Sequence, residues 1–128
     1  MTRVLDAPTA QLQIRRLTPA DLDAAIAIDA GIIGRRRLAY FERRLRAALK
    51  DPEEHVQFAA CRDGGLCGYV LGRRMTGEFG RTEPALRLEM IGVSPDRQGQ
   101  GTGTMLLREL ERWGRKRGIA EIRTGAEW

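Results

Sequence analysis

The chain has 128 residues, of which 42% are hydrophobic and 30% are charged, a composition typical of one soluble globular domain. No apolar run approaches the ~20 residues that cross a bilayer. The N-terminus lacks the apolar core of a signal peptide, so we expect a cytoplasmic protein with no membrane partner. The formal net charge is +5, and all but two of the 22 basic residues are arginines. This excess fits either an anionic partner or a solvated surface of biased composition.

The inventory of reactive side chains excludes several enzyme classes. The single serine, Ser94, precedes Pro95, and the single histidine is His55, so a Ser-His-Asp hydrolase lacks a turn that presents its nucleophile. Cys61 and Cys67 have no further ligand pattern around them, which predicts two buried thiols and no metal site. Aromatic residues make up 5% of the chain, too few to interleave with the arginines as base stacking requires, so a nucleic-acid partner is disfavoured.

The first part of the chain predicts a strand and two helices. Residues 1–10 show no periodicity and are expected to form a flexible tail. A strand is expected over 11–17, and a helix follows from about Pro19 to Asp29, ended by Gly31 and Gly34. A second helix is indicated by apolar residues at three- and four-residue spacing, all expected in the core: Leu38, Phe41, Leu45 and Leu49.

The middle of the chain predicts three strands. Residues 56–62 and 66–75 flank a turn of one aspartate and two glycines, which indicates a β-hairpin. A further strand is expected over 85–93, because apolar Leu86, Leu88 and Met90 alternate there with Arg87, Glu89 and Ile91. Gly92 interrupts the alternation and is the expected place of a β-bulge.

The last part predicts a helix and a strand. The helix is expected over 104–117, with Leu106, Leu110 and Trp113 on one face and Gly118 as its stop. A strand is expected over 119–125. The resulting order, β-α-α-β-β-β-α-β, indicates an α/β domain whose mixed sheet is flanked by helices.

A glycine-rich segment connects the strand at 85–93 to the helix at 104–117. Gly99, Gly101 and Gly103 alternate there with polar residues, so the backbone can turn sharply and present successive N–H groups. The partial positive charge of the helix N-terminus adds to these donors, which predicts an anion-binding seat. A flexible connection without a ligand is the alternative.

The spacing of the glycines indicates which kind of anion the segment binds. A dinucleotide fingerprint G-x-G-x-x-G needs glycine at position 104 or 106, where Thr104 and Leu106 stand. The spacing Gln98-x-x-Gly101-x-Gly103 instead resembles the pyrophosphate loop Q/R-x-x-G-x-G/A of the GNAT superfamily, the acyl-CoA-dependent N-acyltransferases. The segment from Glu89 to Thr104 is the specific part of this resemblance.

The resemblance implies a GNAT-like fold, a mixed and mostly antiparallel central sheet with flanking helices. It also implies acetyl-CoA as cosubstrate and acetyl transfer to a primary amine of a small molecule or protein, by direct attack on the thioester. A bulge at Gly92 would aim the N–H of Val93 at the thioester carbonyl and stabilise the oxyanion. The implied cofactor-binding residues follow the fourth strand and the loop after it: Ile91, Gly92, Val93, Arg97, Gln98, Gly99, Gln100, Gly101, Thr102, Gly103 and Thr104.

The attacking amine must lose a proton, so a base is expected near the thioester. Glu89 is the candidate, because a glutamate of the fourth strand often has this role in the family and because we expect Glu89 on the same strand face as Ile91. An ion pair of Glu89 with Arg87 or another arginine is the alternative. The acceptor pocket is expected from the segments 31–37 and 76–84, where Glu78 and Glu83 are weaker candidates for holding a cationic substrate.

The sequence stops at Trp128, where the fifth strand of the resembled family would end. The expectation is therefore one acyltransferase-like domain over 11–128 that lacks the family's usual C-terminal helix and strands. The strand at 119–125 would then have an exposed edge, which favours association, so a homodimer is expected with this strand or Trp128 at the contact. An acyl-CoA-binding protein without turnover is the alternative function.

Overall fold

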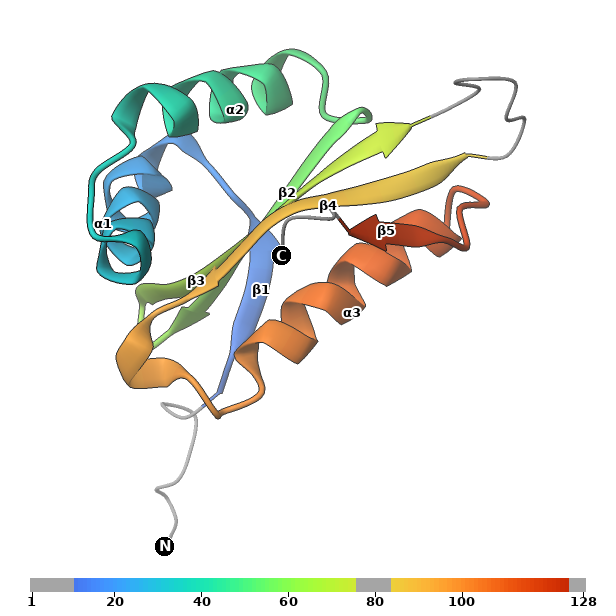
Figure 1. Ribbon diagram of the computed structural model, residues 1–128. Helices are drawn as coiled ribbons and strands as arrows, with labels where there is room; N and C mark the ends of the chain where they lie inside the picture. The colour runs from blue at the N-terminus through green and yellow to red at the C-terminus, as the bar shows by residue number, and fades with distance from the viewer. Residues whose placement is uncertain (1–10, 76–83, 125–128) are drawn as a thin grey trace, which may run out of the picture.

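The computed structural model describes residues 11–75 and 84–124, which form one open sheet with helices on both faces (Figure 1). The expected tail at 1–10, the connection that contains Glu78 and Glu83, and the terminal Gly125 and Trp128 lie outside these residues. Within the described part of the chain, no helix is both long and apolar enough to cross a membrane.

The strands lie side by side in chain order. They are β1 (Gln13–Arg16), β2 (His55–Arg62), β3 (Gly65–Met75), β4 (Ala85–Val93) and β5 (Ile122–Thr124). Neighbouring strands from β1 to β4 are antiparallel, and β5 is parallel to β4. This arrangement confirms the predicted mixed, mostly antiparallel sheet and the hairpin between β2 and β3.

Two helices cover one face of the sheet and the third covers the other (Figure 1). A 3₁₀ turn over Pro19–Asp21 leads into α1 (Leu22–Ile33), which is followed by α2 (Leu38–Lys50). The prediction that Gly31 ends the first helix is wrong, because α1 continues to Ile33 and stops at Gly34 in a left-handed conformation, with φ of 85°. On the opposite face, α3 (Thr102–Arg115) starts two residues earlier than predicted.

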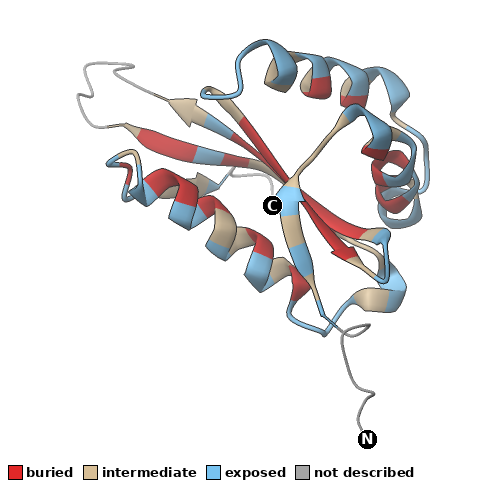
Figure 2. Cartoon of the chain, turned by 180° about the vertical axis from the view of Figure 1, so that it is seen from behind, coloured by how far each residue is buried: buried red, intermediate tan, exposed pale blue. Residues whose placement is uncertain are grey.

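The core occupies both sides of the sheet (Figure 2). The predicted apolar face of α3 is confirmed, because Leu106, Leu110 and Trp113 are all buried against the sheet. On α2 the prediction is half wrong: Phe41 and Leu45 are buried, but Leu38 and Leu49 are 48% and 60% exposed. These two leucines stand at the ends of α2, and only its central turns pack against α1 and the sheet.

Two further predictions concern the cysteines and the length of the last strand. Cys61 and Cys67 are free and buried, as expected. The last strand is shorter than predicted, because residues 119–121 precede β5. Ile119 is a core residue whose N–H donates to the carbonyl oxygen of Gly114 at 2.8 Å, so it closes the turn after α3.

The β-bulge of β4 lies at Glu89, and its prediction at Gly92 is wrong. Leu71 of β3 pairs with Met90, while the next residue, Gly72, pairs with Leu88, so Glu89 is the extra residue. The side-chain alternation therefore reverses at this point: Leu88 and Ile91 pack on the α3 side, and Met90 packs on the side of α1 and α2. The expectation that Glu89 shares a face with Ile91 is wrong for this reason.

Gly92 is required for a different reason than a bulge. It pairs with Tyr69 of β3, and a Cβ at position 92 would lie 2.6 Å from atoms of the Tyr69 ring. The absent side chain thus makes room for a buried aromatic ring, which belongs to the core cluster under α1.

Candidate active site

The loop between β4 and α3 turns sharply at two glycines. After the 3₁₀ turn over Pro95–Arg97, Gly99 and Gly101 adopt left-handed conformations with φ of 83° and 81°. Residues other than glycine rarely take this conformation without strain. A Cβ at either position would meet no described atom within 4 Å, so both glycines border open space.

The start of α3 presents unpaired backbone donors to this space. Gly101 is the N-cap, and the first bond inside the helix runs from the N–H of Met105 to the Gly101 carbonyl oxygen. The N–H groups of Thr102, Gly103 and Thr104 therefore precede the regular hydrogen bonding, and no side chain caps them. Together with the helix dipole they make a seat that fits a diphosphate.

Side chains of the loop mostly hold its shape. The guanidinium of Arg97 lies 3.7 Å from the carboxylate of Asp63 in the β2–β3 turn. The Gln98 side chain donates to the carbonyl oxygen of Val93 at 3.3 Å, which ties the loop to the end of β4. Thr102 is 1% exposed and packs towards Gly68, so an anion would meet its backbone N–H. The seat is thus built of amides more than of charged side chains.

The end of β4 has backbone groups that face away from β3. Ser94 donates its N–H to the Cys67 carbonyl oxygen of β3 at 2.8 Å. Along an antiparallel pair of strands, every second residue points its backbone N–H and carbonyl groups at the neighbouring strand, and the residues between point theirs away. The N–H groups of Ile91 and Val93 therefore point to the side of β5. In the described residues, β5 pairs with β4 only over Leu86–Leu88, so these two N–H groups meet no strand. The Val93 N–H thus points away from β3, as the family resemblance implies, and strand alternation rather than a bulge at Gly92 gives it this direction.

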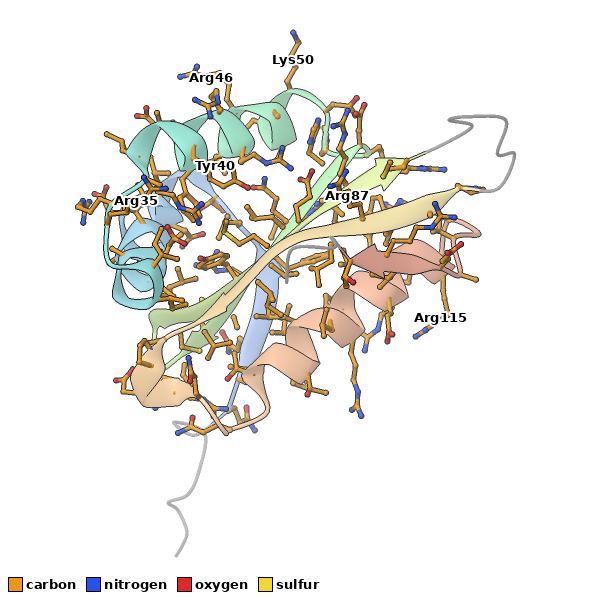
Figure 3. All side chains as sticks on the ribbon, in the orientation of Figure 1. Arg35, Tyr40, Arg46, Lys50, Arg87 and Arg115 are labelled. Carbon is orange, nitrogen blue, oxygen red and sulfur yellow. The ribbon has the colours of Figure 1, made fainter. Side chains whose placement is uncertain are left out.

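A cleft of about 700 Å³ lies between β4 and the two helices α1 and α2. Figure 3 shows Tyr40 on α2 and Arg87 on β4 in the space between these elements. Two predicted site residues, Glu89 and Ile91, line it, and so do three residues of the predicted acceptor segment 31–37. The complete lining comes from four elements and one loop: Asp29, Ile32, Ile33, Arg37, Tyr40, Arg44, Tyr69, Arg87, Leu88, Glu89, Met90 and Ile91.

Both carboxylates of the cleft are paired with arginines. Asp29 of α1 is buried and accepts two hydrogen bonds from Arg37, at 2.8 and 2.7 Å. Glu89 at the β4 bulge forms an ion pair with Arg44 of α2, and both of these side chains are largely buried. Glu89 lies on the α2 side of the sheet, so the alternative of an ion pair with another arginine describes its environment. Its role as a base stays a prediction.

The cleft also contains a buried phenol. The hydroxyl of Tyr69 lies 3.7 Å from the Met90 sulfur, and burial raises the pKa of Tyr69 well above its usual value. Its ring packs edge-on against Phe41 of α2 with 5.6 Å between centroids. The Tyr69 hydroxyl therefore stays protonated at physiological pH, and its packed ring forms part of the cleft wall.

Sequence reasoning missed Arg44 and the pair of Asp29 with Arg37. A signal for Arg44 was present, because it follows Phe41 by three residues and precedes Leu45, which puts it on the buried side of α2. The pair of Asp29 with Arg37 depends on the turn after α1, which ends at Gly34 and brings Arg37 back to Asp29.

Comparison with known proteins assigns the family. The sequence model of the acetyltransferase (GNAT) family matches residues 23–126, so the chain belongs to this family. No curated protein matches it.

In the residues that the structure describes, no three His, Cys, Asp or Glu side chains gather as metal ligands would.

Solved structures share the fold at low sequence identity. A protein of Bacillus halodurans C-125 described as a transcriptional regulator is 18% identical, with a TM-score of 0.79 over 91% of this chain and 82% of that one. The aminoglycoside acetyltransferase AAC(6')-Iy, in complex with a CoA bisubstrate analogue, is 18% identical, with a TM-score of 0.76 over 91% and 80%. Ribosomal-protein-alanine N-acetyltransferase of Brucella melitensis biovar Abortus 2308 is 20% identical, with a TM-score of 0.72 over 91% and 80%.

Proposed function

We propose that this chain transfers the acetyl group of acetyl-CoA to a primary amine of a small molecule or protein. The proposal rests on one observation. The end of β4 that has no neighbouring strand beyond Leu88 lies between the amides at the start of α3 and the cleft that contains Glu89. A long cosubstrate can then be held at one end while its thioester reaches the acceptor at the other.

The loop and β4 are proposed to hold the cosubstrate in two parts. The amides of residues 98–104, with Gly99 and Gly101 leaving room beside them, bind the diphosphate. Outward backbone groups between Ile91 and Val93 pair with the amides of the pantetheine as a neighbouring strand would, and the Val93 N–H is left for the thioester carbonyl. This places the thioester at the cleft, beside the bulge at Glu89.

The cleft residues then assist a direct displacement. Glu89, directly or through water, accepts a proton from the ammonium form of the acceptor, and the neutral amine attacks the carbonyl carbon. The N–H of Val93 donates to the developing oxyanion. A new C–N bond forms, the C–S bond breaks, and the thiolate of CoA leaves with its electron pair and takes up the second proton that the nitrogen loses. No covalent enzyme intermediate is needed.

A second function is favoured by the ion pair of Glu89 with Arg44. If that pair persists when ligands are bound, the chain holds acyl-CoA without turnover, because the carboxylate is not available as a base. The two functions differ in a single measurable event, the release of free CoA thiol.

The test is a single-turnover assay with acetyl-CoA, excess chain and a mixture of primary amines. Free thiol is measured by a colorimetric reagent, and the acetylated amine is identified by mass spectrometry. The proposal predicts thiol release that depends on added amine and equals the amount of acetylated product. Binding of CoA without any release supports the alternative function instead.

A cytoplasmic site of action is part of the proposal. Cys61 and Cys67 are both free, and such thiols are typical of a reducing compartment, where acetyl-CoA is also made and used.

A further inference from the structure

The charges of the cleft do not cancel. Asp29 is neutralised by Arg37 and Glu89 by Arg44, which leaves one charged lining residue, Arg87. Arg87 is exposed on β4, and no described residue forms an ion pair or hydrogen bond with its side chain. Among the described lining residues the cleft therefore has one positive charge in excess and no free carboxylate.

The position of Arg87 is unfavourable for the fold alone. It pairs across the sheet with Arg73 of β3, and like charges directly opposite each other destabilise a sheet. Arg73 has a partner of its own, because its guanidinium donates to the Glu54 carboxylate at 3.2 Å. The cross-strand neighbour thus does not stabilise the guanidinium at position 87, whereas an anionic ligand would.

Arg87 also lies at a useful distance from the reaction. It precedes Glu89 by two residues on β4, and both line the cleft on its α2 side. A strand rises about 3.3 Å per residue, so their Cα atoms are roughly 7 Å apart. The seat at the start of α3 lies beyond the other end of β4 (Figure 1). An acceptor with its amine at Glu89 would therefore extend towards Arg87, away from the cosubstrate.

We infer that the acceptor is a small primary amine that also bears an anionic group, a carboxylate or a phosphate, and that Arg87 binds this group. The inference rests on the proposed function, because Glu89 is taken as the place of the amine. Arg87 is then the residue that selects the acceptor by charge. A polycationic acceptor, such as an aminoglycoside, would meet the excess positive charge of the described lining residues, none of which offers it a free carboxylate.

Three unbranched amines of equal length test the selection by charge. They are 4-aminobutyrate, butylamine and 1,4-diaminobutane, which carry a carboxylate, no second charge and a second ammonium. Binding is followed by amide chemical shifts of the ¹⁵N-labelled chain, with and without CoA, so the readout does not require turnover. Phosphoethanolamine and ethanolamine, compared in the same way, decide between phosphate and carboxylate as the preferred anion.

The unaltered chain is expected to bind 4-aminobutyrate or phosphoethanolamine about tenfold more tightly than the matched neutral amine, and 1,4-diaminobutane most weakly. Arg87→Gln should remove this preference, and Arg87→Glu should reverse it in favour of the diamine. Arg115→Glu is the control, since Arg115 lies on α3 across the sheet from Arg87 (Figure 3). This control should keep the original order.

Several results would overturn the inference. These are equal affinity for the three amines, tighter binding of the diamine, no binding of any amine, or an order that Arg87→Glu leaves unchanged. Failure of the proposed function looks different. A chain that prefers the anionic amine but releases no thiol from acetyl-CoA keeps the charge selection and loses the catalysis.

Discussion

Asp21 fastens the start of α1 to β1. Its carboxylate accepts hydrogen bonds from the Arg15 guanidinium at 2.7 and 2.9 Å, and from the backbone N–H and the hydroxyl of Thr18 at 2.8 and 3.1 Å. The bonds from Arg15, followed by those from Thr18, lower the pKa of this carboxyl although its burial opposes the shift. A carboxyl with a lowered pKa in the folded chain stabilises the fold only while it is ionised.

Asp21→Asn is expected to lower the free energy of unfolding by about 1–3 kcal/mol at pH 7, because the amide cannot replace the charged acceptor of four hydrogen bonds. The difference from the unaltered chain should persist down to about pH 4 and shrink as the pH falls further through the lowered pKa. Urea unfolding of the variant and the unaltered chain at pH 7 and near pH 3 measures the difference in unfolding free energy and its dependence on pH. A difference that is equal at the two pH values would contradict this role.

Glu89 is the residue on which turnover is predicted to depend. Glu89→Gln should reduce the turnover rate by about a hundredfold, with little change in the affinity for CoA, because only proton removal is lost. Rapid-mixing assays of thiol release and calorimetric titration with CoA measure the two quantities. Glu111→Gln, an exposed position on α3, is the matched control and should change neither.

The alternative role of Glu89 predicts another outcome. If Glu89 serves only as the partner of Arg44, its removal leaves a largely buried guanidinium unpaired, which distorts the cleft. Affinity for CoA and stability would then fall together with turnover.

At the scale of elements, the order of helices and strands could be predicted because the periodicity of apolar residues is a local property. The bulge at Glu89 could not, because it depends on how β3 and β4 align, and the sequence of β4 offered Gly92 as the more obvious irregularity. Similarly, the spacing of Leu38 and Leu49 indicates one helix face but not how far the neighbouring elements extend beneath it.

The two halves of the candidate site differ in the same way. The amide seat is formed by consecutive residues from 98 to 104, so its glycine spacing is readable in the sequence. The cleft joins residues from α1, α2, β3 and β4, which are separated by up to about sixty positions. Arg44 and Glu89 become partners only once the fold has brought the Arg44 side of α2 near the bulge of β4.

Gly92→Ala tests the close packing between β3 and β4. The added Cβ would lie 2.6 Å from the Tyr69 ring, so strand or ring must shift, and we expect a loss of about 1–3 kcal/mol in unfolding free energy. Gly103→Ala is the control, because its Cβ would have ordinary contacts at 3.9 Å and alanine favours a helix. Thermal unfolding that ranks the two variants in the opposite order would show that Tyr69 does not confine position 92.

At the scale of the whole molecule, β5 is an edge of the described sheet. It pairs with β4 alone, and such an edge offers unpaired backbone groups to another chain. We propose a homodimer in which the β5 edge lies at or near the contact. Light scattering at high micromolar concentration should give twice the mass of the chain, whereas a monodisperse monomer would contradict the dimer.

The central claim is that the amides at the start of α3 hold the diphosphate of CoA. Calorimetric titration with CoA tests it most directly, in the unaltered chain and in Gly101→Asp. The substituted carboxylate would occupy the seat and repel the diphosphate, and its Cβ would strain the left-handed backbone there. We predict one CoA per chain for the unaltered protein and no measurable binding for the variant. No binding to either, or equal binding to both, would contradict the account.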